Sequence, residues 1–128
     1  MKEYLFTIDG ETFDVEVVKL EREFVVSESA QPRQMADGSI CRMIDGTYIH
    51  YTMTVRSGRN PNELEAFWEK ISRPASVVVC RFPYGRRTIS QKMYVQKGSQ
   101  QMLHQSDKGN RWGEITIRFL AQEFRSEV

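Results

Sequence analysis

The sequence has little of what most function classes require. Only two cysteines and two histidines occur among its 128 residues, and neither cysteine has the CxxC or Cys/His spacing of a zinc site. No apolar run approaches the roughly 20 residues of a membrane-spanning helix. The first four residues, Met1-Lys2-Glu3-Tyr4, are too polar for a signal peptide. We therefore expect a cytosolic protein without a membrane partner, in which Cys41 and Cys80 are reduced unless their strands are neighbours.

The sequence also lacks an excess of charge of either sign. Eighteen basic residues stand against seventeen acidic ones, so the net charge of +1 gives no long-range field that would attract nucleic acid or an anionic membrane. No GxSxG, HExxH or phosphate-loop motif occurs, and His50 and His104 have no cysteine or carboxylate at ligand spacing. These absences predict a protein that is not an enzyme, with no cofactor, no metal and no small-molecule substrate.

Three Asp-Gly pairs are the clearest turn signals. They are Asp9-Gly10, Asp37-Gly38 and Asp45-Gly46, and none has the alternating acidic ligands of a calcium loop. The first follows a short apolar segment and predicts a hairpin. The second lies in a polar segment, residues 27–38, that predicts a protruding loop.

The alternation of apolar and polar residues predicts several strands. Residues 18–26 alternate with one wet face, and Ile49, Tyr51, Met53 and Val55 give the cleanest strand pattern. Residues 76–82 are rich in valine and predict a strand that is buried on both faces or covered by the helix. A half-exposed strand over 88–95 and a closing strand over 115–121 follow. Residues 99–110 are polar and predict a long surface connection.

Helix signals occur in one place. Asn60 is a good N-cap, Pro61 suits the first helical position, and Pro74 ends the segment. One face carries apolar residues at helical spacing, namely Leu64, Phe67, Trp68 and Ile71. We expect a helix over about residues 61–72 that packs against the sheet.

These elements predict a mainly β fold in one domain spanning residues 1–128. The expected architecture is an antiparallel β-sandwich or barrel of about seven to nine strands, with the helix on one side and a loop protruding at about residues 27–38.

Two aromatic features suggest surfaces that bind other molecules. Trp68 and Trp112 both fit core positions, and Trp112, beside Arg111, also fits an interface anchor. Arginines interleaved with aromatics form a short segment that is an alternative binding hairpin for single-stranded nucleic acid. Its residues are Arg81, Phe82, Tyr84, Arg86 and Arg87.

The order of several short motifs resembles that of small tail proteins of siphophages and prophages of Gram-positive bacteria, including distal-tail and tail-tube proteins. The first motifs are Phe6-Thr7-Ile8-Asp9-Gly10, a loop around Arg33, and Arg42-Met43-Ile44-Asp45-Gly46-Thr47. After the helix and the valine-rich strand come Lys92-Met93-Tyr94-Val95 and Trp112-Gly113-Glu114-Ile115-Thr116-Ile117. The resemblance covers about 120 residues, though no single motif is specific and a second, carbohydrate-binding-like domain is missing.

The resemblance implies a structural virion component that packs into homo-oligomeric rings and contacts other tail proteins. It would reside in the virion tail, and in the bacterial host cytoplasm during assembly. The polar segment then becomes the expected contact with a neighbouring subunit. The candidate interface residues are Gln31, Pro32, Arg33, Gln34, Met35 and Asp37.

Overall fold

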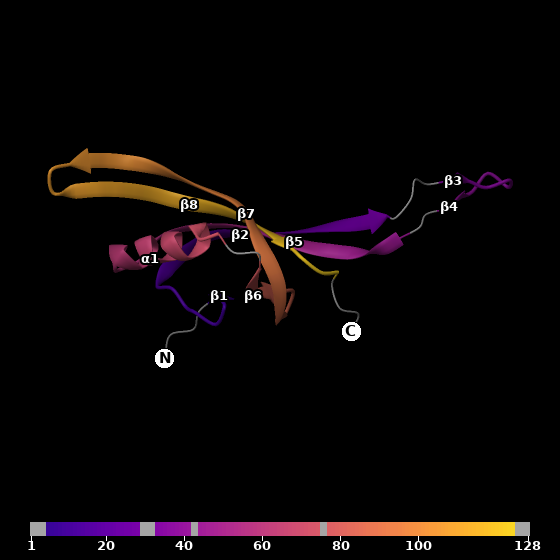
Figure 1. Cartoon of the computed structure of the whole chain (residues 1–128), viewed down its shortest axis with the longest axis horizontal. Coiled ribbons are helices and arrows are strands. Elements are labelled where there is room, and N and C mark those ends of the chain that lie inside the picture. The colour runs from indigo at the N-terminus through magenta and orange to yellow at the C-terminus, as the bar shows by residue number, and fades with distance from the viewer. Residues whose placement is uncertain (1–4, 29–32, 42–43, 75–76, 125–128) are drawn as a thin grey trace.

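The computed structural model describes residues 5–28, 33–41, 44–74 and 77–124. Six strands form one antiparallel sheet in the order β1-β6-β7-β8-β5-β2, and a single helix packs against it (Figure 1). The sheet strands are β1 (Thr7–Ile8), β2 (Val15–Glu28), β5 (Ile44–Ser57), β6 (Val78–Tyr84), β7 (Arg87–Ser106) and β8 (Gly109–Ala121). Two further strands, β3 (Arg33–Gln34) and β4 (Ile40–Cys41), pair with each other. The predicted mainly β, antiparallel class with one helix is confirmed.

The predicted number of strands is wrong. The sheet has six strands instead of seven to nine, because segments expected to be interrupted by turns or loops are continuous. β2 and β5 each run for 14 residues, and they pair along their whole length. The strand order begins at β1 and ends at β2, and these two outer strands form the edges of one sheet.

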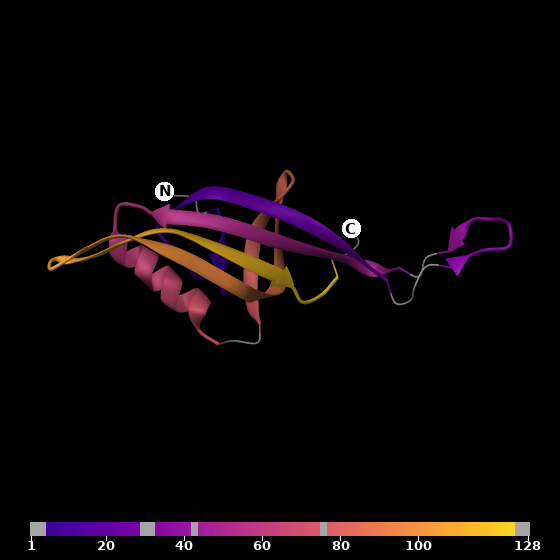
Figure 2. The same cartoon turned by 90° about the horizontal axis from the view of Figure 1, so that it is seen from above.

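The sheet bends where β7 changes partners. The first part of β7 pairs with β6 and the second part pairs with β8, so the β6–β7 hairpin runs across the long strands (Figures 1 and 2). Two hydrogen bonds fix this crossing. The Tyr51 hydroxyl donates to the Pro83 carbonyl oxygen at 2.8 Å, and Gln91 Nε2 donates to the Ile49 carbonyl oxygen at 2.9 Å.

Helix α1 (Pro61–Ser72) forms where the sequence predicts it. The Asn60 side chain accepts a hydrogen bond from the Asn62 backbone N–H at 3.0 Å, as an N-cap should. Leu64, Phe67 and Ile71 are buried against the sheet, which confirms most of the predicted apolar stripe, and Trp68 is half-buried beside them. In the described part of the chain, no helix is both long and apolar enough to cross a membrane.

The core lies between α1 and one face of the sheet. The buried positions of β5 are Ile49, Tyr51, Met53 and Val55, exactly the alternating residues that the pattern predicts. In β6, by contrast, Cys80 and Phe82 are buried while Val79 remains 45% exposed. β6 is therefore buried on one face only, so the first predicted alternative, burial on both faces, is wrong.

The first Asp-Gly pair forms the tight turn that it predicts. Asp9 and Gly10 have φ angles of 53° and 79°, and Ile8 and Glu11 exchange backbone hydrogen bonds across them. Asp45-Gly46 does not turn but lies within β5, where Gly46 pairs with Ser27. A Cβ at Gly46 would lie 2.6 Å from Cγ of Phe124, so glycine is required there for close packing.

The predicted surface connection over residues 99–110 is wrong. β7 continues to Ser106 and β8 begins at Gly109, so these residues form a two-stranded β7–β8 ribbon. Polar composition does not prevent this pairing, because backbone hydrogen bonds hold the two strands. Gln100 adds a side-chain bond, since its Nε2 donates to the Gly113 carbonyl oxygen at 3.0 Å. The name β7–β8 ribbon is used below for residues 101–113, which lie beyond the last β5–β8 pair, Val55 with Ile115.

Cys80 is a free, buried thiol, and burial raises its pKa to about 12. It therefore stays protonated and behaves as a small core side chain. The backbone of Cys41 pairs with Arg33 in the β3–β4 hairpin, beyond the end of β2 and β5 (Figure 1).

Candidate functional site

The β3–β4 hairpin holds part of the candidate interface. Gln31 and Pro32 lie outside the described residues, and Arg33 is described by its backbone alone. Gln34 and Asp37 are exposed, and Met35 is 51% exposed. A hairpin thus stands where the sequence predicts a protruding loop, and it lies beyond the ends of β2 and β5 (Figure 2).

The tip of this hairpin is fixed by local bonds. The Met35 backbone N–H donates to the Ser39 carbonyl oxygen at 2.6 Å, and the carboxylate of Asp37 accepts from the Ser39 hydroxyl at 2.6 Å and from its backbone N–H at 2.9 Å. These two bonds lower the pKa of Asp37. These bonds fix the backbone conformation of the tip, in which Met35 is exposed to solvent.

The arginine-rich hairpin formed by β6 and β7 separates its residues onto different faces. Phe82 points into the core and is fully buried, whereas Arg81, its neighbour in the strand, is exposed on the opposite face. The turn lies at Gly85-Arg86, where Gly85 has a φ of 62°. Of the five residues predicted to bind nucleic acid, Phe82 is therefore unable to stack on a base.

Tyr84 is the other aromatic residue of that hairpin, and two guanidinium groups flank its ring. The Cζ of Arg22 from β2 lies 5.0 Å from the ring centroid, and the Cζ of Arg87 lies 5.9 Å from it. Cation–π contacts of this kind occupy the ring. The hairpin tip is thereby attached to β2, a contact that the sequence pattern did not predict.

A hollow of about 610 Å³ opens beside this contact, between β2–β5 and the hairpin tip. We call it the Phe24 hollow. Its lining residues are Arg22, Glu23, Phe24, Val26, Thr47, Ile49 and Tyr84. Phe24 pairs with Ile49 and shares its face, yet Phe24 is 71% exposed. The apolar face of the β2–β5 pair thus continues past the part that α1 covers.

A second exposed apolar group lies on the β7–β8 ribbon. Met102 and Trp112 are paired across the two strands on one face and are 40% and 39% exposed. Leu103, 64% exposed, lies on the opposite face, next to Gly113. We call Met102 and Trp112 the ribbon patch. The core position predicted for Trp112 is wrong, because the two strands extend beyond the helix and the core.

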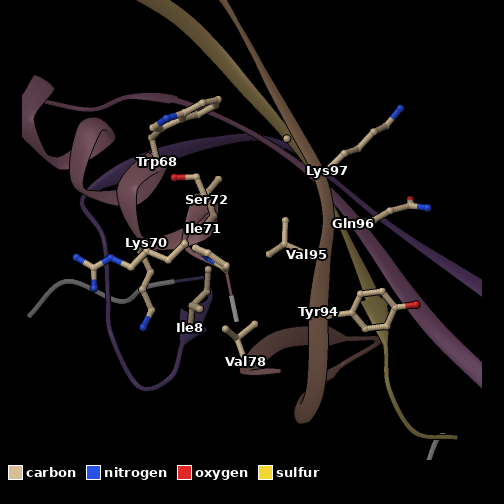
Figure 3. A pocket seen from close by; sticks show the side chains of 13 residues that line it. Ile8, Trp68, Lys70, Ile71, Ser72, Val78, Tyr94, Val95, Gln96 and Lys97 are labelled. Carbon is tan, nitrogen blue, oxygen red and sulfur yellow. The ribbon is translucent and has the colours of Figure 1, made fainter. Parts of the chain in front are cut away.

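A second hollow, of about 320 Å³, lies between the C-terminal half of α1 and β7 (Figure 3). Ile71 and Val95 point into it, while Tyr94 and Gln96 point away. Of the basic residues that line it, Lys70 is paired, because its Nζ lies 3.1 Å from a carboxylate oxygen of Asp9. This hollow brings no nucleophile, base or metal-ligand set together.

Asp9 connects three elements around that hollow. Its carboxylate accepts a hydrogen bond from the Val79 backbone N–H at 2.7 Å, and this bond, with the contact to Lys70, lowers the pKa of Asp9. The Asp9 backbone N–H donates to the Val79 carbonyl oxygen at 2.7 Å. The residue joins the first turn to β6 and to α1, which is a structural role.

β2 is an edge strand and carries most of its charge in ion pairs. Glu16 pairs with Arg56 at 2.6 Å, and Glu23 pairs with Arg118 at 3.2 Å. On the same outer face, His50 Nδ1 accepts a hydrogen bond from the Ala121 backbone N–H at 3.0 Å. Partial burial lowers the pKa of His50, so the imidazole there is neutral at ordinary pH.

No family model matches the chain, and no curated protein matches it.

Proposed function

We propose that this protein is a structural component of a phage or prophage tail, of the tube, distal-tail or baseplate type. It assembles into rings through its sheet edges and its projecting hairpins, contacts other tail proteins, and belongs to the virion, with assembly in the host cytoplasm. The observation that carries this proposal is that its long strands extend well beyond the core and leave an edge strand and large apolar side chains open (Figure 1).

The open edge of β2 is the first support. A strand at the edge of a sheet presents unpaired backbone donors and acceptors, which readily pair with another chain. β2 offers 14 residues of such an edge. Edges of soluble monomers are usually short or covered, so an edge of this length favours a protein that assembles.

The exposed apolar residues are the second support. Phe24 on β2 and Leu103 on the β7–β8 ribbon are 71% and 64% exposed, and both lie on strands instead of flexible loops. Each lies beside a surface hollow, and exposed apolar side chains at such places favour interaction sites. The order of sequence motifs resembles that of small tail proteins. This resemblance is the reason for proposing a phage tail as the kind of assembly.

The alternative, a nucleic-acid-binding barrel, has weaker support. Stacking on single strands requires accessible aromatic faces beside basic groups. Phe82 is buried in the core, and the ring of Tyr84 already contacts the guanidinium groups of Arg22 and Arg87. Subunit assembly therefore fits the surface better than base stacking does.

The direct test is the mass of the purified full-length chain by analytical ultracentrifugation, with negative-stain electron microscopy of the same sample. We expect a mass that is a multiple of 15.0 kDa and ring or tube particles. A chain that stays monomeric as its concentration rises, alone and with neighbouring tail proteins, would overturn the proposal.

A deletion tests the predicted interface loop. Removing residues 31–36 takes away most of the candidate interface residues, and we expect smaller or fewer particles from a folded chain. Unchanged particles would rule out this segment as a subunit contact while leaving the other surfaces in place.

A further inference from the structure

We propose that His50 holds residues 121–124, at the end of β8, against the outer face of β5 at neutral pH, and that protonation of its ring in acid releases them from β5. We call these residues the 121–124 segment. The proposal describes a pH-dependent contact built into the fold. It goes beyond the proposed function, because the contact acts within a single chain and does not depend on assembly.

Side-chain bonds replace the β5–β8 ladder at the end of β8. Phe119 is the last residue of β8 that pairs with β5, and a continued ladder would place Ala121 opposite Ile49. Both residues bond side chains instead. The Ala121 N–H donates to Nδ1 of His50 at 3.0 Å, and the Ile49 carbonyl oxygen accepts from Nε2 of Gln91 at 2.9 Å. His50 therefore joins β5 to the end of β8 in place of a backbone pair.

The direction of this hydrogen bond determines the protonation state that it needs. A backbone N–H can only donate, so Nδ1 must carry a lone pair, and the proton of the neutral ring lies on Nε2. Protonation of the ring adds its second proton at Nδ1. Two N–H groups then face each other, and the bond is lost. Ala121 is buried, so its N–H needs a new partner, and movement away from β5 lets water supply one.

The charged groups around His50 do not offset this loss. Glu23 lies opposite His50 on β2, and it is paired with Arg118 of β8 at 3.2 Å. Beyond β8, Glu123 is paired with Lys92 at 3.7 Å. Partial burial lowers the pKa of His50 from its ordinary value of 6.5, Glu23 raises it and Arg118 lowers it, and the net shift is downward. The folded chain thus favours the neutral ring that the hydrogen bond requires.

The other contacts described for this segment are modest. The Gln122 N–H donates to the Lys92 carbonyl oxygen at 3.0 Å. The ion pair of Glu123 with Lys92 joins side chains that are 65% and 57% exposed, and ion pairs of that exposure contribute little. The ring of Phe124 packs on Tyr48 with centroids 4.5 Å apart, yet Phe124 is 41% exposed. Because a segment with few buried contacts opens easily, the loss of one buried hydrogen bond is enough to shift it.

Release of the segment uncovers apolar surface on β5. Phe124 covers Gly46, where a Cβ would lie 2.6 Å from Cγ of its ring, and it also packs on Tyr48. Gly46 lies near the start of β5, the strand that follows the β3–β4 hairpin along the chain. The protonation of His50 therefore controls access to the end of β5 that follows the candidate interface.

The direction of the pH dependence follows from the pKa of His50 in the two forms. The ring binds a proton more weakly when the segment is closed than when it is open, where the ordinary value of 6.5 applies. The closed form is fully stabilised above pH 6.5 and loses this stabilisation as the pH falls through the lower pKa of the closed form. Between the two values a proton is taken up on opening, so the ratio of open to closed chains rises about tenfold per pH unit.

The test measures the hydrogen exchange of the Ala121 amide by NMR at a series of pH values. The rate is expressed as a protection factor, which removes the pH dependence of intrinsic exchange. For the native chain we expect this factor to fall about tenfold per pH unit below pH 6.5. His50→Asn places an amide oxygen near the position of Nδ1, and because this oxygen does not titrate, Ala121 should stay protected throughout. His50→Leu has no acceptor, so Ala121 should be unprotected at every pH.

Two controls isolate the contact. His104→Asn changes the other histidine, which is exposed on the β7–β8 ribbon, and this variant should behave like the native chain. The amide of Ile117, a fully buried residue of β8, reports in the same samples whether the sheet stays folded, and its protection should not change.

Several results would overturn the inference. One is a protection factor of Ala121 that does not change with pH in the native chain. Others are the same pH dependence in His50→Asn, or native protection in His50→Leu. A parallel loss of protection at Ile117 would mean that acid unfolds the sheet instead of releasing the segment. None of these results depends on assembly, so the failure of this inference and the failure of the proposed function are distinguishable.

Discussion

The part of the sheet under α1 and the strands that extend beyond it are built from the same chain but differ in what stabilises them. Under the helix, Phe67, Tyr51 and Phe119 are fully buried and pack in one cluster. In the β7–β8 ribbon, side chains are exposed and the two strands depend on their mutual backbone bonds. The core therefore supplies most of the stability of the fold, and the extensions leave exposed surface that the proposed assembly would use.

The largest effect should come from the core. Phe67→Ala removes a ring that packs edge-on against Phe6 and Phe13, with centroids at 5.6 and 5.2 Å, and leaves a cavity. We expect the free energy of unfolding to fall by about 3–5 kcal/mol in urea titrations. In the control, Phe24→Ala, a change within about 0.5 kcal/mol is expected for the monomer. Equal losses in both variants would erase the distinction between core and extension.

A smaller effect should come from the bond that holds the β6–β7 hairpin across the sheet. Tyr51→Phe keeps the ring stacked on Phe82 at 4.5 Å but removes the donor to the Pro83 carbonyl oxygen. We expect the free energy of unfolding to fall by about 1 kcal/mol. The urea midpoint should fall while the dependence on urea concentration is unchanged. A stability equal to that of the native chain would mean that the hairpin does not need this bond.

The effect of Asp9 should be smaller still and should depend on pH. The folded chain lowers the pKa of Asp9 below its ordinary 3.8, so the charged form stabilises the fold above that pH. This stabilisation is lost as the pH falls through the folded value. Asn tolerates the positive φ of this position, so Asp9→Asn removes the charge without straining the turn.

At neutral pH, we expect the free energy of unfolding of the native chain to exceed that of the Asp9→Asn variant by less than about 1 kcal/mol, because solvent screens a partly exposed carboxylate. The difference should vanish below the folded pKa. Urea titrations of both chains across the acid range measure it, and a difference that persists undiminished in acid would contradict the assignment to charge.

The elements that sequence reasoning predicted correctly are those whose signals are local. Asn60 and Pro74 define the ends of α1 because capping and proline geometry act within one turn. The alternation around Tyr51 predicts the buried face of β5 because that strand has a core on one side and solvent on the other.

The errors arise where a distant partner decides the structure. Gly46 lies in a strand because β2 pairs with it and Phe124 packs on it, and neither contact is visible in the Asp-Gly signal. The β7–β8 ribbon has no apolar alternation, since neither of its faces covers a core. Trp112 has the size and apolarity of a core residue, but its burial depends on how far the strands extend beyond the helix.

The candidate site was predictable only in part. Phe24 falls on the apolar face of the predicted strand, but its exposure follows from the length of α1, which covers one part of β2–β5. Arg22 and Tyr84 are far apart in sequence and meet only because the sheet bends at β7. The β3–β4 hairpin occupies the segment that its polar composition predicted to protrude.

Hydrogen–deuterium exchange of the native chain, compared between dilute and concentrated solutions, is the most direct test. It asks whether the core only stabilises the fold while the extended strands bind other copies. We expect a higher concentration to add protection in β2 and in the β7–β8 ribbon and to leave exchange in α1 and the buried part of β5 unchanged. Added protection on α1, or none in either extension while the mass rises, would contradict it.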